Sequence, residues 1–488
     1  MFSPSLGRTA RVALLSPRVQ AAVLVTLAMP QLYLLPQGTS DVALTTIVSV
    51  LFLGAGLIRF VRTPIRPVAN LGLLFGVLGA LLAVRLLALA WSPDPSAGLQ
   101  PVFLLGQFVI ALMVMSAALR ADPALLRNLQ RWYWPWVVAE ICLVLLFRFL
   151  PGVEMGFLRS VGGVFAGNNT IAALFSNSPN NVFDHAKAGG VFVNANVAAM
   201  FLGVNGLAAL AVSAVTRTRW VTVVGVAALV AVPFTGSKSA TVLAFTLPFL
   251  ALGGYQMFGS TMPARRRYLI VGALAAASAG ILVVLVANTT LRNAMVEAFV
   301  GRTEIWGFGA KSFLASPFIG LGYGGWDAGF PAYAAAHGIY RSFPPHNVLL
   351  AAWATTGIVG LVLTLGFFVL AFRFVARGLA GRVPIDRRFV VFAGAAIAWI
   401  FIQGMGENTD FFGEIHLIPV LALLLVHLTQ PVDQEAEGLA TAYRRDSPAS
   451  AVQDVGDVHL QSGDGSAWLS AAVRGEGQGP GQTGSRLG

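Results

Sequence analysis

The sequence has few charged residues and a single cysteine, and both shortages restrict the kind of protein that it encodes. Only 11% of the 488 residues are charged, whereas soluble globular chains carry roughly a quarter. Cys142 is the only cysteine, so an internal disulfide and a thiolate metal cluster are excluded. A soluble globular fold and a disulfide scaffold are therefore both ruled out.

Motifs of several common classes are also missing. No Asp-x-Asp pair occurs on the face predicted below to be the outer one, which argues against a metal-bound nucleotide-sugar donor. No Walker A motif is present, which argues against ATP-driven export. Glu407 and Asp410 are not spaced convincingly for the carboxylate pair of a glycosidase. We expect neither a bound metal nor a cofactor.

Long apolar runs make up much of the chain, in which 56% of the residues are hydrophobic. Runs of about 18 or more residues are typical of membrane-spanning helices and are too long for barrel strands. The sequence thus predicts an all-α polytopic membrane protein with about twelve transmembrane helices of roughly 20 residues each. The expected spans are 19–36, 41–60, 69–91, 100–118, 134–150, 193–214, 220–236, 239–257, 268–288, 348–372, 390–406 and 417–430.

Basic residues fall at every second boundary between these spans, which the positive-inside rule explains if all these boundaries are cytoplasmic. Both termini are then cytoplasmic, and the net charge of +11 needs no nucleic-acid partner. The outer, periplasmic face receives two long loops, 151–192 and 289–347. Seven basic residues on this face break the rule and are better functional candidates than those that obey it: Arg159, Lys187, Lys238, Arg292, Arg302, Lys311 and Arg341.

The composition changes abruptly after Gln430. Residues 431–488 are rich in Gly, Ser, Asp and Glu and have no sustained apolar period. Such a segment cannot bury enough surface to offset its ordering entropy, so it is predicted to be a disordered cytoplasmic tail. Residues 1–430 are predicted to form one membrane-embedded domain, with its signature region at 289–360.

His346 is the first candidate for chemistry, in the polar, aromatic-rich interval 301–360. Pro344 and Pro345 cannot sit inside a helix, and Asn347 is a good N-cap for the apolar run that follows. His346 therefore lies at the positive end of a helix dipole, which keeps the imidazole neutral, as a general base requires. An interfacial histidine that only binds lipid headgroups is the simpler alternative.

The order of motifs around His346 resembles the signature of the O-antigen ligase and O-antigen polymerase superfamily. An R-x-x-x-W helix, a P-x-x-G-x-G-x-G turn and His-Asn-x9-Gly-x-x-Gly follow one another. They are formed by Arg302/Trp306, by Pro317/Gly320/Gly322/Gly324 and by His346/Asn347/Gly357/Gly360. Small residues such as Gly357 and Gly360 are expected to permit close helix packing. The similarity extends to the span count and the large outer loop, and so covers most of residues 1–430.

The resemblance implies a metal-independent, inverting glycosyltransferase of GT-C-like architecture in the bacterial cytoplasmic (inner) membrane. Its donor would be a glycan on undecaprenyl pyrophosphate, used at the outer face. In ligases of this superfamily the acceptor is lipid A-core; in polymerases it is another lipid-linked repeat. His346 would deprotonate the acceptor hydroxyl, and Arg302 would stabilise the leaving pyrophosphate. The alternative roles for Arg302 are contact with lipid headgroups and a structural ion pair, with Glu304 as a candidate partner.

Further site residues are implied less strongly. The superfamily commonly has Ser-Arg-Ser/Gly where this chain has Thr235–Ser239, so Lys238 would bind pyrophosphate without the fork geometry of arginine. Asn194 and Asn196 match a family-like Asn at the outer end of a span and are candidates for binding glycan or phosphate, although capping of that helix is the favoured alternative. Asn347, Trp306, Tyr323 and Arg341 are supporting or substrate-binding candidates, and an interfacial aromatic belt is the alternative for the aromatic residues.

Two other functions stay open at this point. Ligase and polymerase share these motifs, and a non-enzymatic transporter of lipid-linked oligosaccharides would also be polytopic. The expected partners of the glycosyltransferase are a lipid-linked glycan donor, a glycan or glycolipid acceptor and the lipid bilayer.

Overall fold

The computed structural model of the chain describes residues 16–27, 71–166, 186–258, 262–339, 343–381, 385–407 and 416–429, with short pieces at 32–33, 43–44, 46–52, 54, 171 and 184. The chain divides into two units, Met1–Glu435 and Ala436–Gly488, and all described residues belong to the first. The predicted tail 431–488 lies outside the described residues, and its disorder stays a prediction.

Long helices form the described part of the chain, which has no strand beyond an isolated bridge between Tyr33 and Ala43. The predicted all-α class is confirmed. The helices at the predicted spans from 69–91 onward are α4 (Leu71–Ala88), α5 (Pro95–Ala121), α6 (Leu125–Phe149), α10 (Ala195–Thr216), α11 (Arg219–Ala231), α12 (Lys238–Phe258), α13 (Ala264–Ala287), α16 (Val348–Leu379), α17 (Arg387–Gly404) and α18 (Ile418–Leu428). Two of them are extended by short 3₁₀ turns, η1 (Leu89–Trp91) and η4 (Val232–Thr235).

Seven of the described helices are long and apolar enough to cross a membrane: α4 with η1, α5, α6, α10, α12, α16 and α17. Two shorter apolar helices, Arg219–Thr235 and Ile418–Leu428, accompany them. A polytopic helical membrane protein is therefore confirmed. The count of twelve and the GT-C-like architecture stay predictions. Of the first two predicted spans, 19–36 and 41–60, only α2 (Pro17–Leu27) and a few further residues are described.

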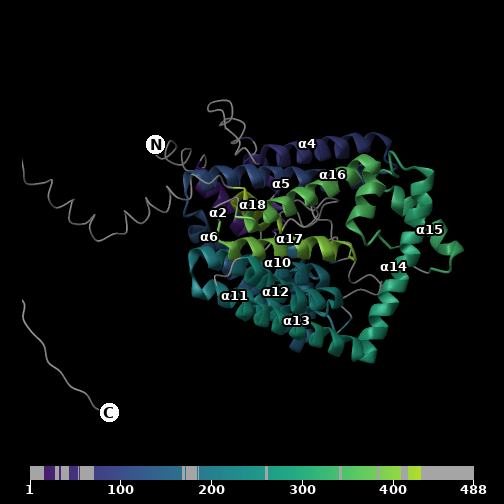
Figure 1. Ribbon diagram of the computed structural model, residues 1–488. Helices are drawn as coiled ribbons and strands as arrows, with labels where there is room; N and C mark the ends of the chain where they lie inside the picture. Colours follow the sequence, from purple (N-terminus) through teal and green to yellow (C-terminus); the bar gives the residue numbers. More distant parts are fainter. Residues whose placement is uncertain are drawn as a thin grey trace, which may run out of the picture. The chain divides into compact units, whose positions relative to one another are not determined.

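The two segments predicted to be long outer loops contain helices of their own. Residues 151–192 hold α7 (Pro151–Ser160), α8 (Gly162–Ala166) and η3 (Gly190–Phe192). Residues 289–347 hold α14 (Thr289–Ala315) and α15 (Gly325–Ala336). Figure 1 shows α14 running across the ends of the long helices rather than along them. Hydropathy separates membrane from non-membrane segments, so it marked this region as a loop although its backbone is helical.

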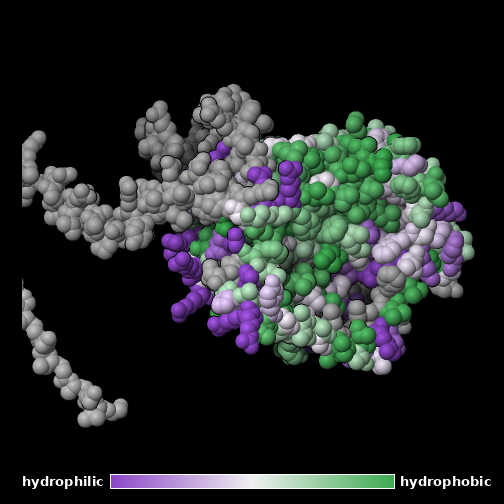
Figure 2. Space-filling view, in the orientation of Figure 1, coloured by the Kyte–Doolittle hydropathy of each residue, from purple (hydrophilic) through white to green (hydrophobic). Residues whose placement is uncertain are grey.

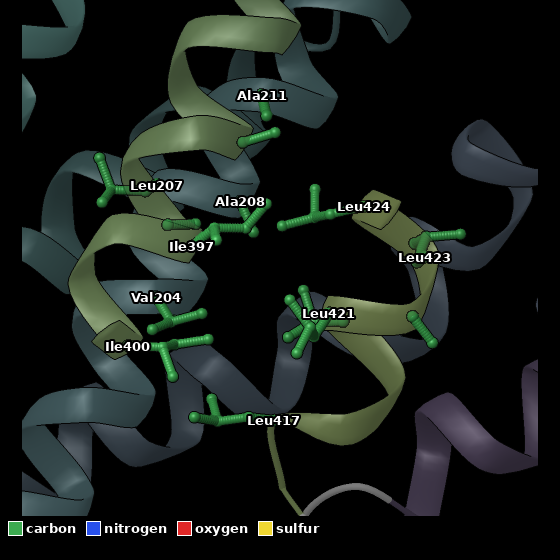
Figure 3. Close-up of a cluster of buried hydrophobic side chains, with 14 of the residues drawn as sticks. Val204, Leu207, Ala208, Ala211, Ile397, Ile400, Leu417, Leu421, Leu423 and Leu424 are labelled. Carbon is green, nitrogen blue, oxygen red and sulfur yellow. The ribbon is translucent and has the colours of Figure 1, made fainter. Parts of the chain in front are cut away.

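Helix α10 lies at the centre of the core. Val204, Leu207 and Ala208 of α10 face Ile397 and Ile400 of α17, and α18 covers both helices with leucines (Figure 3). Gly203 lets the two helices approach closely, since a Cβ there would lie only 2.1 Å from the ring of Trp399. The tight packing of α10 on α17 fixes the positions of the residues at their ends.

The surface follows the same plan. On the face drawn in Figure 2, hydrophilic side chains gather toward the two ends of the helices, and a broad hydrophobic surface lies between them. A hydrophobic belt of this kind is what a bilayer core of about 30 Å requires. The polar ends of the helices are thus the regions in which a site for polar substrates is expected.

Candidate active site

Glu407, three residues beyond the end of α17, is the centre of a polar cluster. Its Oε1 accepts a hydrogen bond from Nη2 of Arg302 at 2.9 Å, in an ion pair, and another from Oγ of Ser239 at 3.2 Å. Its Oε2 accepts from Nδ2 of Asn196 at 2.8 Å. One buried carboxylate therefore joins α10, α12, α14 and the end of α17.

Asn347 connects this cluster to the start of α16. Its Oδ1 accepts hydrogen bonds from the amides of Leu349 and Leu350, both at 3.0 Å, so it caps the helix as the sequence predicted. Its Nδ2 donates to the carbonyl of Met405 at 3.4 Å, two residues before Glu407. Asn347 thus fixes the entrance of α16 against the end of α17.

Trp306 supports the segment that leads to His346. Its Nε1 donates a hydrogen bond to the carbonyl of Pro345 at 3.1 Å. Trp306 lies one helical turn after Arg302 on α14. The R-x-x-x-W spacing therefore places one residue on the Glu407 cluster and the other on the residue before His346.

His346 adopts a left-handed backbone conformation, with φ of 47°, which costs a non-glycine residue roughly 1–2 kcal/mol. Its side chain is half-buried, and its Nδ1 atom has no hydrogen-bond partner among the described residues. Burial, reinforced by the positive charge of Arg302, lowers the pKa of His346 to about 4. The imidazole is therefore neutral near pH 7, for causes other than the helix dipole invoked from the sequence.

The charge on Glu407 is balanced by several neighbours. Burial raises the pKa of its carboxyl group, and Arg302, the Ser239 hydroxyl and Lys187 offset part of that rise. Lys187 also forms an ion pair with Asp184 at 3.7 Å. The next residue, Ala188, donates its amide to the carbonyl of Thr235 at 3.0 Å. The loop that carries Lys187 therefore packs on the turn that precedes Lys238.

Lys238 lies at the edge of the cluster. It is the first residue of α12, and its neighbour Ser239 contacts Glu407. The Lys238 side chain is exposed and forms no hydrogen bond or ion pair with the described residues. Of the three residues predicted to act together, Arg302 and His346 interact electrostatically, whereas Lys238 borders them.

The Gly-rich turn after Pro317 packs into a break in α16, which corrects one prediction. Gly357 has φ of 69° and ψ of −166°, so the helix is interrupted there. The amide of Leu321 donates to the carbonyl of Ala354 at 2.7 Å, and that of Ile358 donates to the carbonyl of Pro317 at 3.1 Å. Gly357 was expected to allow helix–helix packing. It instead admits the backbone of the turn, since a Cβ would lie 1.8 Å from the Phe318 carbonyl oxygen.

The same turn is anchored on the start of α5. Its three glycines at 320, 322 and 324 all have positive φ. The backbone amide of Tyr323 donates a hydrogen bond to Oγ of Ser92 at 2.7 Å, and the Tyr323 carbonyl accepts one from the amide of Asp94 at 3.0 Å. The Tyr323 side chain is only 3% exposed and packs on Gly98. This burial favours a structural role for Tyr323 over the predicted contact with substrate.

Some expectations for site residues were incomplete. Glu304 is exposed, whereas Glu407 forms an ion pair with Arg302. From the sequence, Glu407 was considered only as one carboxylate of a glycosidase pair, and that role was rejected. The available signal for Glu407 was an acidic residue just beyond a predicted span on the outer face, opposite unpaired basic residues. Asn194 caps α10, which leaves the Asn196 side chain to bind Glu407. Arg341 lies outside the described residues.

A metal site does not emerge from the part of the chain that the structure describes. No three His, Cys, Asp or Glu side chains gather there in a group able to hold a metal ion. The chemistry available to the described cluster is that of a neutral imidazole, a guanidinium and a carboxylate.

Residues 223–365 match the family model described as O-antigen ligase. The matched region includes Lys238, Arg302 and His346, whereas Asn196 and Glu407 lie outside it. The match confirms the resemblance to the O-antigen ligase and polymerase superfamily, whose substrates are in general lipid-linked glycans. No curated protein matches the chain.

Proposed function

We propose that this membrane protein of the O-antigen ligase and polymerase superfamily transfers a glycan from undecaprenyl pyrophosphate to an acceptor hydroxyl at the outer face of the bacterial cytoplasmic membrane. The reaction inverts the anomeric centre and uses no metal ion. The observation that carries the proposal is the pairing of a neutral, half-buried His346 with the cation Arg302. A base and a phosphate-binding cation are the two groups that this reaction needs.

In the proposed step, the acceptor hydroxyl oxygen attacks the anomeric carbon of the donor sugar. The hydroxyl proton passes to the unprotonated nitrogen of His346, and a new glycosidic C–O bond forms. The bond between the anomeric carbon and the pyrophosphate oxygen breaks, and its electron pair leaves with undecaprenyl pyrophosphate. Attack from the face opposite the leaving group accounts for inversion.

Arg302 is proposed to stabilise the leaving pyrophosphate as negative charge accumulates there. A guanidinium binds phosphate oxygens in a bidentate manner, and such charge-assisted hydrogen bonds are stronger than neutral ones. Glu407 is a positioning residue in this scheme, because it holds the Arg302 guanidinium at 2.9 Å. Ser239 and Asn196 in turn fix the two oxygens of Glu407.

Binding of the donor is also expected to strengthen the base. With a pKa of about 4, His346 is neutral but a weak base. A pyrophosphate bound near Arg302 adds negative charge beside the imidazole and so favours its protonated form. The pKa of His346 therefore rises toward its ordinary value when the donor is present, which couples proton abstraction to donor binding.

The test is transfer by the purified full-length protein from a lipid-linked donor to an acceptor. His346→Ala should insert normally and lower the transfer rate at least roughly 100-fold, the low end of the range for general acid–base catalysis. His337→Ala is the matched control. His337 follows α15, is exposed and stacks on Tyr333 at a ring-centroid distance of 3.9 Å. Near wild-type activity of His346→Ala would refute the proposed mechanism.

Ligase and polymerase are distinguished by the glycans of a deletion strain. If the acceptor carries no polymer and lipid-linked polymer accumulates, the protein is a ligase. Single repeats on the acceptor indicate a polymerase. If the purified protein transfers no glycan from any lipid-linked donor but moves such donors across vesicles, the protein is a transporter instead.

A further inference from the structure

The helices that form the candidate active site enclose a second polar region at their opposite ends. Asn196, Ser239 and Glu407 mark one end of α10, α12 and α17. The other ends of these helices carry Arg217 and Arg388, which line a groove. Helices of 18 to 22 residues span about 30 Å. The groove and the Glu407 cluster are therefore separated by about the thickness of a bilayer core.

The groove lies between α11 and α12 and has a volume of about 1170 Å³. Its walls are apolar, with Val226 and Val230 on α11 and Phe245, Phe249 and Leu252 on α12. Val226 and Val230 are 49% and 60% exposed, so the groove opens toward the hydrophobic surface of the bundle.

The depth of the groove matches one leaflet. Its lining on α11 runs from Arg219 to Val230, which corresponds to about 16 Å along a helix. Half of the hydrocarbon core of a bilayer is about 15 Å. A lipid whose headgroup lies at Arg219 would therefore extend its acyl chains along the full length of the apolar walls.

Four arginines surround the polar end of the groove: Arg217, Arg219, Arg387 and Arg388. Asp386 is the only acidic residue among the residues that line it. The hydrophilic cluster at the left of Figure 2 lies at this end of the helices.

Two of these arginines are engaged by α12 or its C-terminal end. Arg388 lies over the ring of Tyr255 at 5.0 Å, and Arg387 donates a hydrogen bond to the carbonyl of Phe258. The Arg217 and Arg219 side chains are exposed and form no hydrogen bond or ion pair with the described residues. The groove therefore has uncompensated positive charge at its polar end.

We propose that this groove binds an anionic phospholipid, with the phosphate held by the arginines and an acyl chain lying between α11 and α12. The positive-inside rule explains basic residues at helix ends. It does not require four of them to converge on an apolar groove one leaflet deep. Basic pockets between membrane helices are known to bind anionic lipid headgroups, and a free phosphate would leave the apolar walls unoccupied. The site is independent of the proposed glycan transfer.

The experiment is native mass spectrometry of the delipidated full-length protein, titrated with a phosphatidylglycerol or a phosphatidylcholine of identical acyl chains. The wild type should retain phosphatidylglycerol selectively. Arg217→Gln combined with Arg219→Gln should weaken this binding about 30-fold, from about 1 kcal/mol for each arginine. Arg265→Gln combined with Arg266→Gln is the matched control, because it removes two exposed arginines from the start of α13, outside the groove.

A second variant tests the apolar part of the site. Val226→Trp fills the groove and leaves all four arginines in place, so it should also abolish selective lipid retention. The proposal is overturned if both lipids bind equally to the wild type, or if the two double variants lose the same amount of lipid. It is also overturned if a second protein copy occupies the groove, which would be seen as a lipid-free dimer sensitive to Val226→Trp.

Discussion

Arginines lie near both ends of the bundle formed by α10, α12 and α17, with Arg302 supplied by α14, but these arginines are held in different ways. At one end Arg302 is partly buried and paired with Glu407 at 2.9 Å. At the other end Arg217 and Arg219 are exposed and have no partner among the described residues. Burying a charge is costly unless a counter-charge compensates it. The comparison shows that the burial and ion-pair partners of a basic residue, more than its position at a helix end, distinguish a catalytic candidate from a membrane-surface residue.

The largest expected effect comes from changing the arginine at the Glu407 end while keeping its charge. Arg302→Lys should lower the rate of glycan transfer roughly 100-fold to 1,000-fold, because lysine cannot bind pyrophosphate in a bidentate manner. Arg219→Lys at the other end should leave the rate unchanged. Steady-state transfer assays of both variants measure the difference, and equal effects would contradict the distinction between the two ends.

Removal of the counter-charge should destabilise the Glu407 end. Glu407→Gln removes the carboxylate that pairs with the partly buried Arg302, which should cost roughly 3 kcal/mol, the low end of the range for breaking a buried ion pair. Glu304→Gln is the control, since Glu304 is exposed on α14, the helix that carries Arg302. Surface changes usually alter the stability by no more than about 0.5 kcal/mol. Thermal unfolding in detergent compares the two. A similar melting temperature for both variants would mean that the ion pair contributes little.

The break in α16 should contribute a smaller amount. Gly357→Ala imposes a positive φ on alanine and crowds the Phe318 carbonyl, which should cost about 2 kcal/mol. Gly366→Ala in the same helix meets no atom within 4 Å and should be neutral or slightly stabilising. Circular dichroism on heating distinguishes these outcomes. If Gly357→Ala is as stable as Gly366→Ala, the turn does not depend on the break.

The smallest expected effect is a shift in a pH profile. His346 is neutral above about pH 4 in the folded protein, so kcat/KM for transfer should fall only as the pH approaches 4. The corresponding acid-side fall in kcat should begin at a higher pH than the fall in kcat/KM, because the bound donor raises the pKa of His346. The same lowered pKa means that the unfolded chain binds more protons between about pH 6.5 and 4, so stability is lost as the pH falls through this window.

The Glu407→Gln variant shows whether His346 or Glu407 causes the loss of activity at low pH. If its kcat/KM profile keeps the acid limb near pH 4, His346 causes the limb. If the limb disappears with Glu407, or lies near 6.5 in the wild type, the lowered pKa of His346 is not the controlling one.

Several features of the candidate site followed from local sequence. Asn347 caps α16 because its side-chain oxygen can accept hydrogen bonds from the free amides of the first turn, and because Pro344 and Pro345 cannot continue a helix upstream. Arg302 and Trp306 lie one turn apart because α14 is helical. The Gly-rich turn was expected, and its three positive φ values agree with the need for glycine at those positions.

Other features depended on contacts between distant parts of the chain. Glu407 pairs with Arg302 across 105 positions and with Asn196 across 211, and no local pattern specifies such a pair. The role of Gly357 was wrongly predicted because a glycine in an apolar run is equally compatible with helix packing and with a break. The burial of Tyr323 on Gly98 likewise depends on how the turn meets α5.

By itself the sequence determined the helical membrane class, the polar segments between the apolar runs and the superfamily motifs, because hydropathy, capping and turn geometry act over a few residues. The tertiary structure alone decided which carboxylate neutralises Arg302, what the break in α16 accommodates and where the unpaired arginines converge on a groove. Those outcomes depend on the packing of α10, α11, α12 and α17, which places residues far apart in the chain within hydrogen-bond distance or along one shared surface.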